Sequence, residues 1–253
     1  MNPFSLNEKH ILITGASSGI GRQCAVSCSQ MGAKVTMVAR NAERLQKSFN
    51  LLEGEGHHVI SCDISHLDSI EDVAKESVEI CGKIDGFIHA AGIEKTLPVK
   101  MHKPKIFKEL LQINSLAAFE FSRQLSLKKY GNLPDISLVF ISSVVGIVGN
   151  MGHSGYSASK GALIAAAKSM AVELAPKKIR VNTISPGHMR DTIMSIKWES
   201  EADENAIQKK IDAHPLGLGE AIDVANAAIY LLSSASKWVT GENIIVDGGY
   251  CAR

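Results

Sequence analysis

The stretch "ITGASSGIGRQCA", residues 13–25, decides the fold of this chain. It continues the apolar run "HILIT" (10–14), which is typical of a buried strand, and leads into residues that suit a helix. Three glycines in it have the spacing G-x-x-x-G-x-G: Gly15, Gly19 and Gly21. Backbone that leaves a strand, approaches a diphosphate and packs a helix tightly on the sheet needs residues without side chains at such positions. The turn therefore predicts a dinucleotide-binding α/β fold, with a tight turn that binds no ligand as the alternative.

The residues between these glycines extend the predicted phosphate site. The N-terminus of the following helix offers free N–H groups and a partial positive charge to an anion. Ser17 and Ser18 add hydroxyl donors, and Ile20, between the last two glycines, is expected at the cofactor as well. A glycine triplet alone is a weak signal, but its place after the first strand and before a helix strengthens it.

Short apolar runs alternate with stretches of helical length, such as 67–81 and 220–234. Near-continuous apolar strands between helices predict a parallel sheet covered on both faces. Seven strands are predicted, at 10–14, 34–39, 58–62, 84–90, 136–142, 179–185 and 243–247. Since no barrel unit repeats, we favour a doubly wound, Rossmann-type sheet over a (β/α)8 barrel. We find no linker or internal repeat, so residues 1–253 are interpreted as a single domain.

Composition excludes several classes of function. Lys and Arg number 27 against 26 Asp and Glu, and aromatic residues make up 5%, which argues against a nucleic-acid or charged-membrane partner. No apolar run approaches the roughly 20 residues of a membrane span, and no signal peptide is evident. The five cysteines are scattered and lack a C-x-x-C pair, so we expect free thiols, no metal site and a reducing, cytoplasmic location.

The end of the second predicted strand bears on the choice of dinucleotide. An acidic residue there would hold the ribose 2′-hydroxyl of NAD(H). Here "VTMVARN" (35–41) provides Ala39 and then Arg40, whose guanidinium can form a bidentate hydrogen bond with a 2′-phosphate. We therefore favour NADP(H) over NAD(H). The alternative is a solvated arginine at the surface of the loop.

A reactive pair is predicted in "SGYSASKGAL" (154–163). Tyr156 and Lys160 are four positions apart, so on a helix they share a face, and their neighbours are small. Reducing a ketone requires a proton for the developing alkoxide, and a tyrosine titrates near pH 10 in isolation. We expect the ammonium to lower the tyrosine pKa, which requires the pair to be partly desolvated.

The order of these motifs resembles the short-chain dehydrogenase/reductase family over essentially the whole chain. The resemblance is carried by "TGASSGIG" (14–21), "AAG" (90–92), Asn114, "ISS" (141–143), "YSASK" (156–160) and "SPG" (185–187). The 3-oxoacyl-[acyl-carrier-protein] reductase branch is the most similar, through "ISSVVGIVGNMGHSGYSASKGAL" (141–163) and "VTGENIIVDGGY" (239–250). The resemblance implies a carbonyl reductase or alcohol dehydrogenase that forms homotetramers.

The resemblance also implies roles for individual residues. Ser143 would hydrogen-bond the substrate oxygen, Asn114 would hold a water in a proton relay, and Tyr156 and Lys160 would also contact the nicotinamide and its ribose. The remaining residues implied at the cofactor are Asp63, Ile64, Ala91, Gly92, Pro186, Gly187, Met189 and Thr192. Alternatives stay open: Ser142 as the active serine, Asn114 as a residue of a kinked helix, Asp63 as the cap of a helix over 64–80, and His153 as an acid rather than a loop residue that shapes the pocket.

Three positions depart from the family pattern. His89 stands where an asparagine is usual, Asp191 stands where a threonine is frequent, with Thr192 next to it, and Val172 occupies a position where carrier-protein reductases place a basic residue. Lys128 and Lys129 would have to supply the basic surface for an acyl carrier protein.

Residues 188–215 are expected to form a mobile lid over the substrate. The substrate itself stays open between a 3-oxoacyl thioester, a sugar, a polyol and a cyclic ketone. The alternative of another class is a dinucleotide-binding sensor or scaffold without turnover, for which the Ser143–Tyr156–Lys160 set would have no use.

Overall fold

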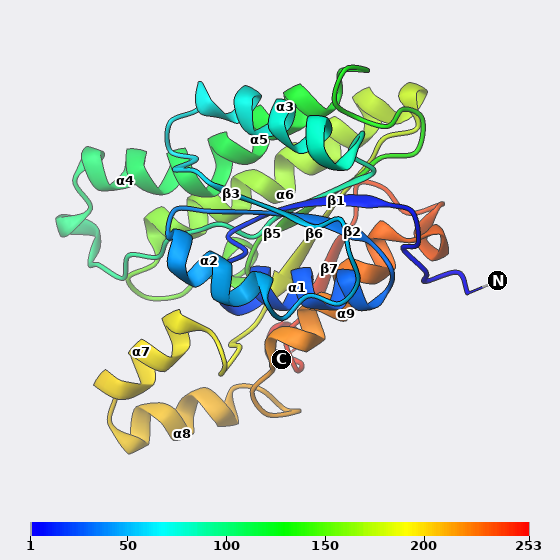
Figure 1. The fold of residues 1–253 in the computed structure, drawn as a ribbon. Helices are drawn as coiled ribbons and strands as arrows, with labels where there is room; N and C mark the ends of the chain where they lie inside the picture. Colours follow the sequence, from blue (N-terminus) through cyan, green and yellow to red (C-terminus); the bar gives the residue numbers. More distant parts are fainter. Residues whose placement is uncertain (1, 253) are drawn as a thin grey trace.

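Seven parallel strands form one open sheet in the computed structural model, which describes residues 2–252 (Figure 1). The strand order is β3-β2-β1-β4-β5-β6-β7. The strands are β1 (His10–Thr14), β2 (Lys34–Ala39), β3 (His58–Ser61), β4 (Gly86–His89), β5 (Ser137–Ile141), β6 (Arg180–Pro186) and β7 (Asn243–Val246). This confirms the doubly wound prediction and excludes the barrel, because the sheet ends at β3 and β7 instead of closing on itself.

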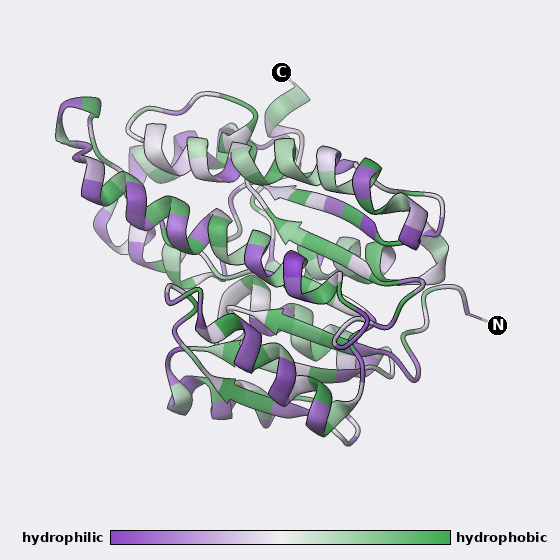
Figure 2. Cartoon of the chain, turned by 90° about the horizontal axis from the view of Figure 1, so that it is seen from above, coloured by the Kyte–Doolittle hydropathy of each residue, from purple (hydrophilic) through white to green (hydrophobic). Residues whose placement is uncertain are grey.

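Helices cover both faces of the sheet (Figure 1). One face carries α1 (Gly19–Gln30), α2 (Ala42–Phe49) and α9 (Ala221–Leu232), and the other carries α3 (Ser69–Cys81), α5 (Ala117–Leu125) and α6 (Ser154–Leu174). Three helices lie toward the carboxyl edge of the strands: α4 (Pro104–Leu111), α7 (Ile193–Glu201) and α8 (Glu204–Asp212). Figure 2 shows hydrophobic strands in the middle layer and hydrophilic residues on the outer sides of the helices, as a two-faced parallel sheet requires.

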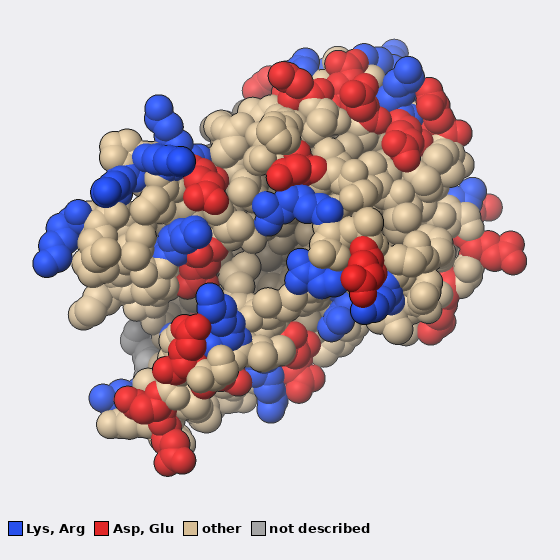
Figure 3. Space-filling view, turned by 60° about the vertical axis from the view of Figure 1, so that its left-hand side comes forward, with Lys and Arg blue, Asp and Glu red and all other residues tan. Residues whose placement is uncertain are grey.

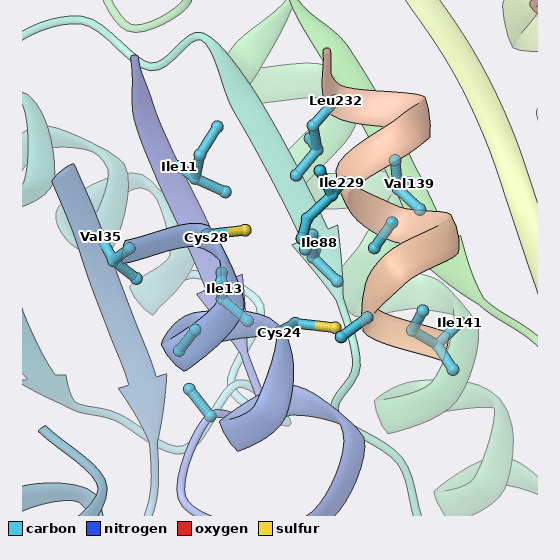
Figure 4. Packing of buried hydrophobic residues seen from close by; sticks show 14 of the residues in the cluster. Ile11, Ile13, Cys24, Cys28, Val35, Ile88, Val139, Ile141, Ile229 and Leu232 are labelled. Atoms are coloured by element: carbon cyan, nitrogen blue, oxygen red, sulfur yellow. The ribbon is translucent and has the colours of Figure 1, made fainter. Parts of the chain in front are cut away.

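Two cores lie on the two faces of the sheet, because side chains alternate along each strand. Ile11 and Ile13 of β1 pack with α1 and α9 on one face, whereas Leu12 between them packs with α3, α5 and α6 on the other. Figure 4 shows the first core, in which the thiols of Cys24 and Cys28 point from α1 into the layer between the sheet and α9. Both cysteines are free and buried.

The topology determines where a ligand can bind. The chain leaves β1 toward β2 and β3 on one side and returns to β4 on the other, so the strand order reverses between β1 and β4. Open α/β sheets bind ligands at such a reversal, outside the carboxyl ends of the strands. Among residues 2–252, no helix is both long enough and apolar enough to span a bilayer.

Candidate active site

The residues expected at the dinucleotide line one cleft at the carboxyl ends of the strands. The structure brings them there from the ends of β1, β2, β3, β4 and β6 and from the segment after β6: Gly15, Ser17, Ser18, Gly19, Ile20, Gly21, Arg40, Asp63, Ile64, Ala91, Gly92, Pro186, Gly187, Met189 and Thr192. Figure 3 shows the hollow from outside, with Lys and Arg side chains on its rims. Residues that are far apart in the sequence therefore lie together at a single site.

The turn between β1 and α1 is packed closely against the segment that follows β4. Gly15 has a φ of +69°, and a Cβ on it would lie 2.6 Å from the backbone N of Ala91. Ser18, at the N-cap of α1, makes no capping hydrogen bond with its side chain, and the first turn of α1 contains no acidic residue. Free N–H groups, two serine hydroxyls and a close backbone approach fit the phosphates of a dinucleotide.

Two arginines line the cleft beyond the end of β2, where the adenosine half of a dinucleotide is expected. Arg40 follows β2 directly, and Arg44 lies one helical turn later on α2, where its backbone N donates to Oδ1 of Asn41. Arg40 Nη1 is 3.8 Å from Oδ2 of Asp63. Sequence reasoning missed Arg44, although its spacing of four from Arg40 on a helix start is the signal that would have found it.

Asp63 lines the cleft and does not cap a helix. Its Oδ1 accepts from the backbone N of Ser65 at 3.0 Å, and α3 begins only at Ser69, so the helix-cap alternative is wrong. Partial burial opposes the charge on Asp63, but the hydrogen bonds from Ser65 and the nearby Arg40 lower its pKa. The contact of this carboxylate with an amino group of the cofactor stays a prediction.

The proposed catalytic side chains line the same cleft beyond the glycine turn. Ser143 follows β5, and Tyr156 and Lys160 lie on the first turns of α6. Lys160 Nζ donates to the backbone O of Ile141 at 2.7 Å and lies 5.8 Å from the centroid of the Tyr156 ring. The hydroxyl of Ser142 donates instead to the backbone O of Lys160 at 2.8 Å, which leaves Ser143 as the serine available to a substrate.

The ionisation of this pair differs from the sequence-based expectation. Burial raises the pKa of Tyr156, and the negative charge of Glu94 adds to the rise, while a hydrogen bond from Ser143 opposes it. Burial also lowers the pKa of Lys160 to about 8. The expectation that the ammonium would make the phenol acidic is therefore wrong for this geometry, because burial dominates and the nearby charge of Glu94 acts in the same direction. Tyr156 is a protonated donor at neutral pH.

Asn114 occupies a π-helical segment, Gln112–Leu116, between α4 and α5. Its Oδ1 accepts from the backbone N of Ile93 at 2.8 Å, and its Nδ2 donates to the backbone O of Ile93 and to Ser159 Oγ, each at 2.9 Å. It is fully buried and does not line the cleft. These contacts fit a residue that holds the backbone of an irregular helix. Oδ1 of Asn114 and Nζ of Lys160 both lie within 3.4 Å of the place that a Cβ on Gly92 would occupy, so the water relay to Lys160 stays a prediction.

Comparisons with known proteins agree with this arrangement. A family model described as enoyl-(acyl carrier protein) reductase matches residues 15–251. The chain belongs to the short-chain dehydrogenase/reductase family. It is 35% identical to a 3-oxoacyl-[acyl-carrier-protein] reductase of Bos taurus, over 96% of this chain and 98% of the relative. It is 34% identical to carbonyl reductase family member 4 of Xenopus laevis, with the same coverage of both chains.

A solved structure of the same family is similar along its full length. It is described as a putative short-chain alcohol dehydrogenase from Sinorhizobium meliloti 1021, and it is 29% identical with a TM-score of 0.90 over 99% of both chains. The relatives identify this chain as an oxidoreductase of the short-chain family that uses a nicotinamide cofactor.

His89, which departs from the family pattern, has a structural role. Its Nε2 donates to the backbone O of Ile113 at 3.2 Å, so its Nδ1 accepts from the hydroxyl of Thr14 at 3.0 Å. Burial and the positive charge of Lys160 lower the pKa of His89 to about 3, so it is neutral. The imidazole thereby joins β1, β4 and the π-helical segment.

The segment 188–215 contains α7 and α8, which stand beyond the carboxyl edge of the sheet (Figure 1). Its base is closed by two backbone hydrogen bonds, from Gly219 N to His188 O at 3.1 Å and from Arg190 N to Gly219 O at 2.9 Å. Thr192 caps α7 and lies against the glycine turn, whereas the Asp191 carboxylate accepts from the N-terminus of α9. Of these two neighbours, Thr192 is therefore the one that faces the cleft.

Sequence reasoning also missed an ion pair in the cleft. Oε1 of Glu94 lies 2.7 Å from Nε2 of His153, and both side chains line the cleft together with Tyr156. The hydrogen bond between them is the main cause of a lowered pKa for Glu94 and a raised pKa for His153. His153 had been expected to shape the pocket, and its place agrees with that interpretation. The only available signal for Glu94 was an acidic residue two positions after the "AAG" turn.

Proposed function

We propose that this protein is an NADPH-dependent oxidoreductase that transfers a hydride between the nicotinamide and a carbonyl or secondary alcohol. The observation that carries the proposal is the shared cleft: Ser143, Tyr156 and Lys160 line the same hollow as the glycine turn. A protein that only bound a dinucleotide would not need a phenol, a hydroxyl and a buried ammonium there. The sensor or scaffold alternative is therefore less well supported.

Each of these side chains has a task in the proposed reaction. When bound, the nicotinamide supplies or accepts the hydride. During reduction, negative charge develops on the carbonyl oxygen, and the hydroxyls of Ser143 and Tyr156 are the donors available to it. Tyr156 then gives its proton to the alkoxide. Once the neutral alcohol has formed, the single O–H of Ser143 can turn to the phenolate, and the Lys160 ammonium lies 5.8 Å from the centroid of its ring.

The preference for NADPH rests on Arg40 and Arg44, which both line the adenosine end of the cleft. Two guanidinium groups beside the ribose would attract a 2′-phosphate, and a guanidinium binds phosphate oxygens in a bidentate manner. No carboxylate follows β2 directly, where NAD-specific relatives of this fold hold the ribose hydroxyls.

An acyl carrier protein is a second candidate as the carrier of the substrate, because several relatives are named for it. The residues that were expected to contact an acyl carrier protein give this candidate little support. Lys129 is paired with Glu71 at 2.6 Å, and Val172 is 79% exposed without a charge. A different basic surface lies next to the cleft, on the segment before and along α4, where five lysines make no ion pair among the described residues: Lys95, Lys100, Lys103, Lys105 and Lys108. An acidic carrier would be expected to bind there, with an affinity that falls with salt.

We further propose a homotetramer that works in the cytoplasm. Large apolar side chains are exposed on α6 and in the region of β7, including Val172, Trp238 and Ile245, and such surfaces are typical of subunit contacts. The free cysteines fit a reducing compartment. Light scattering after size exclusion tests the assembly.

The decisive experiment is NADPH oxidation with a panel of ketones, run with the wild type and with Tyr156→Phe. We expect turnover by the wild type and a loss of about 100-fold or more in the variant, since a general acid typically contributes about 100- to 10,000-fold to the rate. NADPH binding, measured by fluorescence titration, should persist in the variant. Equal rates in the two proteins would overturn the mechanism, and NADPH binding without any turnover would support the sensor alternative.

A further inference from the structure

One wall of the active-site cleft carries the ion pair between Glu94 and His153. Glu94 lies two residues beyond Gly92, and His153 lies three before Tyr156. Their side chains are 31% and 14% exposed, and the rings of His153 and Tyr156 are 6.3 Å apart. A substrate with its carbonyl oxygen at Ser143 and Tyr156 therefore presents its neighbouring carbon atoms to this wall.

His153 has no N–H left for a substrate. Nε2 contacts Oε1 of Glu94 at 2.7 Å, and Nδ1 contacts the backbone O of Met151 at 2.8 Å. A carboxylate and a carbonyl oxygen only accept hydrogen bonds, so both ring nitrogens are donors and the ring is an imidazolium. His153 thus holds Glu94 in place. The backbone on either side is joined as well, because Leu97 N donates to Gly152 O at 2.8 Å.

The carboxylate of Glu94 can accept a further hydrogen bond. Its Oε1 accepts hydrogen bonds from His153 and, at 3.4 Å, from the hydroxyl of Thr96. Its Oε2 accepts no hydrogen bond from any described residue. Two further cations act on Glu94: Lys160, whose pKa is lowered by burial and raised in part by the carboxylate, and Lys210 of α8, whose Nζ lies over the ring of Trp198, 5.0 Å from its centroid. The open hydrogen-bonding position on this wall of the cleft is therefore an acceptor. A partly buried carboxylate in such a place is best satisfied by a donor on the ligand.

We propose that Glu94 accepts a hydrogen bond from a hydroxyl group on a carbon beside the reacting one, so that the substrate is a hydroxyketone or, in the reverse direction, a vicinal diol. The inference rests on the proposed function and narrows its substrate. A simple ketone offers no donor to the carboxylate. Near its reacting carbon, a 3-oxoacyl thioester offers carbonyl oxygens and no hydroxyl hydrogen, so its lone pairs would face the lone pairs of Glu94.

The test compares matched substrates with NADPH as the reductant: 3-hydroxybutan-2-one against butan-2-one, 2-hydroxycyclohexanone against cyclohexanone, and acetoacetyl-coenzyme A as the thioester. For each pair, kcat/KM is measured in the wild type, Glu94→Gln and Glu94→Leu. We expect the wild type to favour the hydroxyketone by about 10- to 100-fold, the range for a hydrogen bond to a charged group. The ratio should fall toward one in Glu94→Leu and take an intermediate value in Glu94→Gln, which keeps a neutral acceptor.

Tyr156→Phe separates the two levels of the argument. Turnover of ketones that depends on Tyr156 but shows no preference for the hydroxylated partner would overturn this inference and leave the proposed function standing. A preference for acetoacetyl-coenzyme A, or the same ratio in the wild type and Glu94→Leu, would also overturn it. If NADPH binds and none of the five compounds is reduced, both the function and the inference fail. The wild-type ratios alone keep the proposal falsifiable should Glu94→Leu not fold.

Discussion

The buried ammonium of Lys160 should make the free protein more stable at alkaline pH. The pKa of this side chain falls from its ordinary value of 10.5 to about 8, because burial disfavours the charge. Between these two pH values, the unfolded chain holds a proton that the folded protein has released. Stability therefore rises with pH in this window. For these two pKa values, the linkage relation gives a gain of about 2 kcal/mol between pH 7 and pH 9.5.

The measurement is urea unfolding of the cofactor-free protein at several pH values up to 9.5, for the wild type and Lys160→Met. The upper limit keeps Tyr156 protonated in both states, since burial raises its pKa and a free tyrosine titrates near pH 10. The gain should disappear in Lys160→Met, while other titrating groups are common to both proteins and cancel. Lys168→Met, an exposed lysine on the same helix, serves as the matched control and should retain the gain. A gain of the same size in Lys160→Met and the wild type would refute the reasoning.

Three further predictions concern the cofactor turn, the 2′-phosphate and the imidazole between the strands. Replacing Arg40 and Arg44 together by Ala should raise the dissociation constant for NADPH about 10-fold or more and leave that for NADH within a factor of about 2, because only NADPH loses a charge-assisted contact; equal losses for both, measured by fluorescence titration, would contradict it. Gly15→Ala should abolish binding of both dinucleotides and destabilise the fold by about 1–3 kcal/mol, since the added carbon meets backbone at a positive φ; calorimetric titration and thermal unfolding check this, and unaltered binding would show that the turn can yield. The pKa of His89 is lowered to about 3, so below pH 6.5 the unfolded chain binds a proton that the folded protein does not, and the free energy of unfolding should fall by about 2 kcal/mol between pH 8 and pH 5. His89→Asn should lack this part of the fall, and an unchanged dependence of stability on acid pH in the variant would contradict the prediction.

The fold was accessible from sequence because its signals are local. Each strand is a short apolar run, and the glycines after the first run need a conformation that few other residues adopt. The order of strands in the sheet then follows from the rules for parallel crossover connections. The shared cleft followed as well, because the carboxyl ends of parallel strands meet at one edge of the sheet.

The electrostatics of the site were not accessible, because they depend on contacts between distant segments. Glu94 and His153 are 59 residues apart, and nothing near either residue indicates that the two meet. The pKa of Tyr156 was predicted in the wrong direction because a sequence shows the charge four residues away and does not show how much water the fold removes. Asn114 was assigned by resemblance, whereas its contacts with Ile93 and Ser159 require the irregular helix that holds it.

The closed base of the segment over the cleft has a consequence for how this scaffold can change. Gly219 is hydrogen-bonded through its backbone to both His188 and Arg190. The segment from Arg190 to Gly219 therefore begins and ends at the same place, and it contributes no strand to the sheet. The entropy of closing such a loop grows only with the logarithm of its length. Insertions, deletions or replacement of α7 and α8 would therefore disturb folding little. A change of this segment can alter the range of substrates while the proton donor and the dinucleotide turn stay as they are.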